Sequence, residues 1–186
     1  DCFRKIQNDY ESNSIFNLSF LSKFKLTHLT VSGDFPLFPY EFFCLNQLEY
    51  LDLLNIRYSC DPLYDDNCSY GKLTFLAVRS VILQSFLPDF VYSFPAIQTL
   101  CLHVNDSAVF DQHLNEIFSS ETLKCLKLYY YRNNGKHLKF DVRITSPIEE
   151  LKLNGVDWKF VSCLFKNVQF SSLKKLTIRL TTKELE

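Results

Sequence analysis

Residues 48–53, Leu-Glu-Tyr-Leu-Asp-Leu, carry an apolar side chain at their first, fourth and sixth positions. The same spacing occurs in seven windows of the 186-residue chain, which begin at residues 26, 48, 73, 97, 123, 148 and 173. One chance match would not predict the place of the next, so the spacing indicates a repeated structural unit. A step of roughly 20–29 residues is typical of solenoids made of stacked strand-containing repeats.

Each unit predicts one short strand followed by a return segment. In Leu51-Asp52-Leu53 a single residue separates two apolar positions, which is the pattern of a strand with one buried face. Stacked units would place these strands side by side in a parallel sheet, and each chain would return along the other side. We therefore predict an α/β, right-handed solenoid with a parallel concave sheet. One buried row should contain Leu51, Leu76, Leu100, Leu126 and Leu151.

The return segments on the convex side are predicted to be a mixture of helices, loops and a strand. Helices are expected after Pro39 and Pro88, and over residues 111–118 and 157–168. The last of these carries apolar side chains at helical spacing: Trp158, Val161, Leu164 and Phe165. Residues 55–71 predict a loop and residues 137–145 a strand.

The repeat pattern also predicts the domain organisation. Residues 1–25 do not fit the pattern, so we expect an N-terminal flank or part of a preceding unit there. The repeat domain then spans residues 26–186. The sequence contains no methionine and no signal-peptide pattern, and we expect it to be a piece of a longer protein.

The seven phased units resemble a eukaryotic leucine-rich repeat protein over about residues 26–180. Residues 87–102, Leu-Pro-Asp-Phe-Val-Tyr-Ser-Phe-Pro-Ala-Ile-Gln-Thr-Leu-Cys-Leu, are similar to the irregular repeats of F-box/leucine-rich-repeat proteins. The resemblance implies a leucine-rich repeat solenoid that recognises the substrate of a ubiquitin ligase. No F-box is visible in the sequence, so the substrate-receptor role rests on the resemblance alone.

Side chains that alternate with the buried strand positions would face the concave side, where we predict that a protein partner binds. Aromatic side chains placed outward are of the type enriched in binding hot spots, and the later units add basic residues. The alternative is a solvated surface on a structural spacer. The predicted partner-binding residues are Tyr50, Asp52, Phe75, Arg79, His103, Lys127, Tyr129, Lys152, Lys175 and Arg179.

Charge narrows the class of partner. The chain has 20 basic and 21 acidic residues and a net charge of −1, which favours neither nucleic acid nor a membrane surface. No apolar run approaches the roughly 18 residues of a membrane-spanning helix. The basic residues of the later units, among which Glu150 lies, favour an acidic protein segment.

Residues with catalytic or metal-binding chemistry are few. Cys101, His103 and Cys125 are expected to lie near one another on adjacent strands. A zinc site takes about four ligands, and a cysteine nucleophile needs an orienting group and an oxyanion site, none of which the pattern supplies. Because a phosphate-binding loop and a nucleophile elbow are also missing, we predict a non-catalytic scaffold without metal or cofactor.

The cysteines and glycosylation patterns bear on the compartment. The seven cysteines lack the clustered spacing of secreted repeat caps, which favours an intracellular location, cytoplasmic or nuclear. Cys60 and Cys68 are the one pair expected to be able to form a disulfide. Asn17, Asn67 and Asn105 each begin an Asn-x-Ser pattern, so a secreted, ligand-binding repeat domain stays open as an alternative.

Overall fold

The structure is a computed structural model that describes residues 21, 23–34, 45, 47–57, 71–79, 94–104, 114–130 and 143–181. The predicted helices after Pro39 and Pro88 and the predicted Cys60–Cys68 pair lie outside the described residues, as does nearly all of the predicted loop at 55–71.

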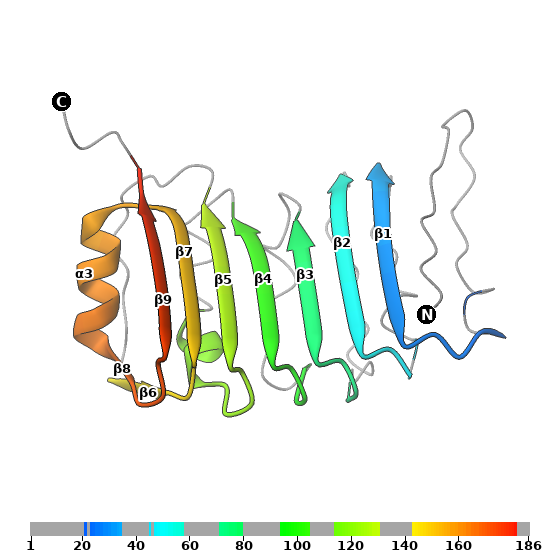
Figure 1. Cartoon of the computed structure of the whole chain (residues 1–186), viewed down its shortest axis with the longest axis horizontal. Coiled ribbons are helices and arrows are strands. Elements are labelled where there is room, and N and C mark those ends of the chain that lie inside the picture. Colours follow the sequence, from blue (N-terminus) through cyan, green and yellow to red (C-terminus); the bar gives the residue numbers. More distant parts are fainter. Residues whose placement is uncertain are drawn as a thin grey trace.

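Seven strands form one all-parallel sheet and follow one another across it in chain order (Figure 1). This arrangement confirms the predicted parallel sheet and is that of a solenoid like those of leucine-rich repeats. The strands are β1 (His28–Asp34), β2 (Tyr50–Arg57), β3 (Phe75–Arg79), β4 (Thr99–Val104), β5 (Cys125–Tyr130), β7 (Glu150–Val156) and β9 (Lys175–Leu180).

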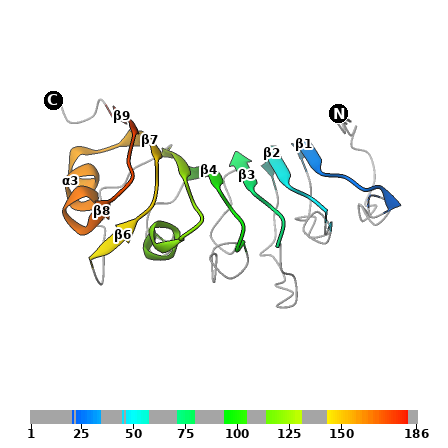
Figure 2. The same ribbon diagram turned by 60° about the horizontal axis from the view of Figure 1, so that its bottom comes forward.

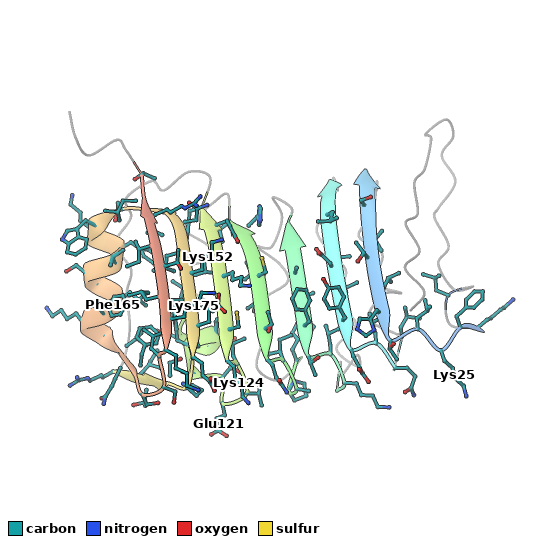
Figure 3. All side chains as sticks on the ribbon, in the orientation of Figure 1. Lys25, Glu121, Lys124, Lys152, Phe165 and Lys175 are labelled. Carbon is teal, nitrogen blue, oxygen red and sulfur yellow. The ribbon has the colours of Figure 1, made fainter. Side chains whose placement is uncertain are left out.

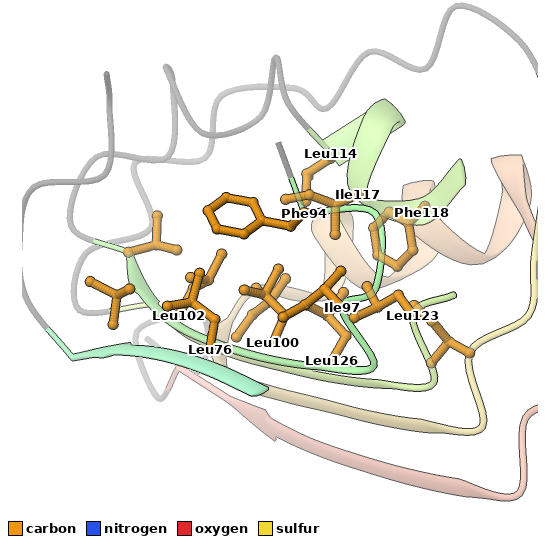
Figure 4. Close-up of a cluster of buried hydrophobic side chains, with 14 of the residues drawn as sticks. Leu76, Phe94, Ile97, Leu100, Leu102, Leu114, Ile117, Phe118, Leu123 and Leu126 are labelled. Carbon is orange, nitrogen blue, oxygen red and sulfur yellow. The ribbon is translucent and has the colours of Figure 1, made fainter. Parts of the chain in front are cut away.

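The strands pair in register with the sequence repeat. Leu51 pairs with Leu76, and the same row continues through Leu100, Leu126 and Leu151, as predicted. All five of these leucines are at most 1% exposed. The second apolar position of each strand forms a parallel row, and side chains from the returns, such as Phe94 and Phe118, close the core behind both rows (Figure 4).

The entry to each strand is held by one repeated backbone contact. The N–H of Tyr50 donates to the carbonyl oxygen of Thr27 at 3.0 Å, and that of Phe75 to the carbonyl oxygen of Glu49 at 3.0 Å. The equivalent bond recurs at every later strand of the sheet, ending with Lys175 N–H and the Glu149 carbonyl at 3.0 Å. The same backbone hydrogen bond, at the same position of the repeat, therefore fixes each unit relative to the preceding one.

The described returns lie behind the sheet (Figure 2). Residues 114–119 are helical, in agreement with the predicted helix at 111–118. β6 (Ile144–Ser146) and β8 (Val168–Phe170) pair as a small parallel sheet. Of the strand predicted at 137–145, only residues 143–145 are among those described, and Ile144 begins β6.

The last return contains helix α3 (Trp158–Asn167), close to the predicted 157–168. The Asp157 carboxylate caps it by accepting the N–H of Phe160 at 2.6 Å. Val161 and Leu164 are buried as the spacing predicts, but Trp158 is 60% exposed and Phe165 39% exposed. The apolar face is therefore narrower than predicted, because α3 stands at the end of the sheet and no described segment covers its far side (Figure 1).

Gly155 makes a bulge in β7. The register between β7 and β9 shifts between Asn154 and Val156, and Gly155 has a φ of 76°. A Cβ at this position would overlap the carbonyl oxygen of Tyr130 on the neighbouring strand. The bulge thus needs both the left-handed conformation and the small size of glycine.

We predict that Gly155→Ala lowers the free energy of unfolding by more than about 2 kcal/mol, since the left-handed conformation alone costs roughly 1–2 kcal/mol. The overlap with Tyr130 adds to that cost. Urea unfolding measures the change, and the neighbouring Asn154→Ala should shift stability by no more than about 0.5 kcal/mol. A loss below about 1 kcal/mol for Gly155→Ala would contradict the described bulge.

Candidate partner-binding face

The sheet has one face away from the returns, which we call the open face (Figures 2 and 3). Its side chains alternate along each strand with the buried rows. The described open-face residues are His28, Thr30, Ser32, Tyr50, Asp52, Leu54, Phe75, Ala77, Thr99, Cys101, His103, Cys125, Lys127, Tyr129, Glu150, Lys152, Asn154, Lys175, Thr177 and Arg179.

Three stacked rings form an aromatic row over the first three strands, made of His28, Tyr50 and Phe75. His28 and Tyr50 have ring centroids 5.4 Å apart, and Tyr50 and Phe75 stack at 4.1 Å with their planes 10° apart. The three residues are register partners on neighbouring strands, which lie roughly 4.8 Å apart. Parallel pairing therefore places the rings face to face. Tyr50 and Phe75 are half-buried and His28 is exposed.

His28 was not among the predicted site residues, although the sequence carried a signal for it. It stands at the same position of its unit as Tyr50 and Phe75. The aromatic row is therefore one residue longer than the two aromatic side chains predicted there. Position within the repeat identifies the extra member, because equal positions become register partners.

A second group, the basic patch, lies over β5, β7 and β9 and contains Lys127, Lys152, Lys175 and Arg179. Lys127 and Lys152 are register partners, and Lys152 and Lys175 both project from the open face (Figure 3). Lys175 is instead a register partner of Glu150, with 3.0 Å between Nζ and Oε1. The basic patch thus consists of a pair of lysines, the Lys175–Glu150 ion pair and Arg179.

The Glu150 carboxylate is tied to its basic neighbours electrostatically. A hydrogen bond from Lys175 holds the pKa of Glu150 below its ordinary value of 4.5, against a smaller opposing effect of burial. The positive charges of Lys127 and Lys175 lower it further. Four cations against one carboxylate still leave this half of the described open face positive at neutral pH.

Tyr129 joins the middle of the open face to the basic patch. Its ring stacks on His103 with centroids 4.7 Å apart, and the Lys152 Nζ lies 5.1 Å from the centre of the same ring. A cation within about 6 Å of an aromatic face is attracted to it. The structure therefore brings together three predicted site residues, one on each of β4, β5 and β7.

The predicted site residue Asp52 is only 5% exposed. Of Arg79, also a predicted site residue, the structure describes the backbone alone. Asp52 sits in the middle of its strand beside Ala77, its register partner, which is itself 0% exposed. Most of the Asp52 side chain is therefore covered in the folded chain, and its contact with a partner stays a prediction.

The two cysteines of the open face, Cys101 and Cys125, lie on the adjacent strands β4 and β5. Cys101 is the register partner of Lys127, and Cys125 that of Thr99, so the thiols are not directly opposite each other. Neither of these two thiols is in a disulfide. Burial raises the pKa of the Cys125 thiol above its ordinary value of 9.0, although Lys127 acts against it. The Cys125 thiol is therefore protonated near neutral pH and a weak nucleophile.

The described ranges carry neither a metal-binding cluster nor a membrane-crossing helix. No three or more His, Cys, Asp or Glu side chains come together there in a way that could hold a metal ion. Nor is any described helix both long and apolar enough to pass through a bilayer.

Comparison with known proteins gives no relative. The chain matches no protein-family model, no curated protein and no solved structure. The repeat architecture of the sheet and the chemistry of the open face therefore carry the functional argument on their own.

We predict that Glu150 titrates below pH 4.5 in the folded chain and that Lys175→Met raises its pKa toward that value. Because the folded pKa is depressed, the stabilisation from this carboxylate is present above about pH 4.5 and is lost as pH falls through the folded value. NMR titration of the carboxyl carbons measures both changes. Lys159→Met, on the exposed side of α3, serves as the control and should leave Glu150 unmoved, whereas an unmoved Glu150 in Lys175→Met would contradict the ion pair.

Proposed function

We propose that the chain is a non-catalytic scaffold that binds a protein partner across the open face. The observation that carries this proposal is the aromatic row, which presents three stacked rings, two of them half-buried and one exposed, on the open face. Rigid aromatic side chains bury large areas at little cost in conformational entropy, which is why they dominate binding hot spots. A bound partner would cover the parts of these rings that their stacking leaves in contact with water.

The arrangement of the open face supports a particular kind of partner. The aromatic row ends on β3, and the neighbouring lysines Lys127 and Lys152 stand on β5 and β7. Tyr50 on β2 and Lys152 on β7 are separated by four strand spacings of roughly 4.8 Å, or about 20 Å. An extended peptide covers that distance with about six residues. We propose a partner segment with an aromatic or aliphatic anchor at one end and carboxylates about six residues away.

The resemblance to F-box/leucine-rich-repeat proteins gives one biological setting for such a contact. In that setting the bound segment would belong to the substrate of a ubiquitin ligase. The competing proposal is a spacer whose open face has no ligand. Binding measurements on open-face variants separate a binding module from a spacer.

Selection of a random twelve-residue peptide library on the immobilised 186-residue chain tests the scaffold proposal. We expect enriched peptides that combine an apolar anchor with Asp or Glu, and we expect Tyr50→Ala and Phe75→Ala to weaken their binding by about 30-fold, equivalent to roughly 2 kcal/mol. The matched control is Thr99→Ala, a small residue of the same row, which should retain binding. Peptides that bind the three variants and the native chain equally would favour the spacer or an interface on the convex side.

The basic patch is tested by the same peptides at varied ionic strength. Binding should weaken as salt rises, because exposed charges are screened. The double variant Lys127→Glu/Lys152→Glu should lose at least tenfold in affinity, or about 1.4 kcal/mol. The control Lys159→Glu/Lys166→Glu makes the same change of net charge on α3 and should leave affinity near native. Affinity independent of salt and of the open-face lysines would remove the acidic partner from the proposal.

A further inference from the structure

The buried leucine rows end at β9 with their side chains half in water. Leu176 is 45% exposed and Leu180 50% exposed, whereas their register partners on β7, Leu151 and Val156, are 0% exposed. β9 pairs with β7 on one side, and no described strand lies on its other side. We call the outer side of β9, with Leu176, Ile178 and Leu180, the β9 edge.

The outward backbone groups of the β9 edge are oriented to form hydrogen bonds with another strand. The N–H groups of Lys175 and Thr181 donate to carbonyl oxygens of Glu149 and Val156 at 3.0 and 2.9 Å, so these odd-numbered residues turn their backbone groups toward β7. Successive residues of a strand point their backbone groups in opposite directions. The N–H and C=O groups of the three apolar residues therefore point outward from the sheet.

Proteins usually block such an edge with charged side chains, proline, a bulge or a charge that points inward. Of these protections, the described β9 strand has two charged side chains, Lys175 and Arg179, but neither a proline nor a charge among its core-facing residues. β9 reads Lys-Leu-Thr-Ile-Arg-Leu, and its two cations alternate with the apolar residues and so lie on the open face. Trp158 and Phe165 on α3 add exposed apolar surface at the same end of the sheet (Figure 1).

We propose that the β9 edge pairs with the β9 edge of a second copy of this chain, antiparallel and about a twofold axis at Ile178. In this register Leu176 of one copy faces Leu180 of the other, and the two Ile178 residues face each other. These are the residues whose backbone groups point outward, so each facing pair can exchange both of its N–H···O bonds. The buried rows of the two copies would then join into one.

Charge on the open face selects this register over its neighbours. With the axis at Ile178, each Arg179 faces Thr177 of the other copy and each Lys175 faces Thr181. An axis at Thr177 would set Lys175 against Arg179, and an axis at Arg179 would set the two Arg179 side chains against each other. Like charges directly opposite are destabilising. Axes between residues would place apolar side chains opposite those of the open face.

The interface should be modest in size, so a reversible dimer is expected. One strand edge with flanking side chains falls toward the low end of the roughly 1,200–2,000 Å² buried by specific interfaces. The average mass of the 186-residue chain, measured by sedimentation equilibrium over a concentration series, should rise from 21.9 kDa toward twice that value. Ile178→Lys should hold the mass at one chain throughout, while Thr30→Lys on the distant β1 should behave as native.

Two double variants test the register itself. Leu176→Lys/Leu180→Glu places opposite charges against each other in the proposed dimer, whereas Leu176→Lys/Leu180→Lys places like charges there. We expect the first variant to dimerise at least tenfold more tightly than the second, with matching circular dichroism spectra showing that both are folded. Strands paired in parallel register would set each substituted side chain against its own copy, so like charges would meet in both variants and the first would have no such advantage.

Three results would overturn the proposal. A native mass that stays at one chain at every concentration would remove the dimer and leave the β9 edge to a further repeat unit added in parallel. A dimer that persists in Ile178→Lys would place the contact elsewhere. Equal dimerisation of the two double variants would exclude the antiparallel register.

Discussion

The structure depends on the in-register stacking of equal positions from one repeat to the next. Leu51, Leu76 and Leu100 exclude water only because each is set against the same position of its neighbours. A slip of one residue would turn a whole strand over and place its leucines in water, so the buried rows hold the register. The backbone bonds at the strand entries repeat with the same period and reinforce it.

The same register that buries the leucines also builds the open face. Residues at equal positions become neighbours about one strand spacing apart, whatever their chemistry. Aromatic residues at one position therefore stack into a row, and Lys127 and Lys152 at another become a close pair of like charges. The open face needs no loop or pocket to organise it, since the constraint that makes the core also sets the spacing of its side chains.

Stacking also explains why the last strand differs from the others. Every unit of a solenoid buries its apolar row against the next unit, so a unit without a neighbour leaves that row in water. No further strand is described beyond β9, where Leu176 and Leu180 are exposed. Trp158 on α3 is exposed at the same end of the sheet. For the two leucines the exposure is a property of position in the stack, because their register partners one unit earlier, Leu151 and Val156, are covered.

The sequence alone determined the strands, the buried row and the seven in-phase units, because period-two alternation and a fixed step are local features of the chain. It also predicted which residues share the open face, including Tyr50 and Phe75. Only the tertiary structure decided how far each side chain is covered: Asp52 is buried and Trp158 is not. It likewise decided that Lys175 pairs with Glu150 while Lys152 lies over Tyr129. The alternation of apolar and polar residues determines which face of the sheet a side chain points to. Burial and charge pairing depend instead on neighbours about 25 residues away in the chain, which become adjacent only when the units stack.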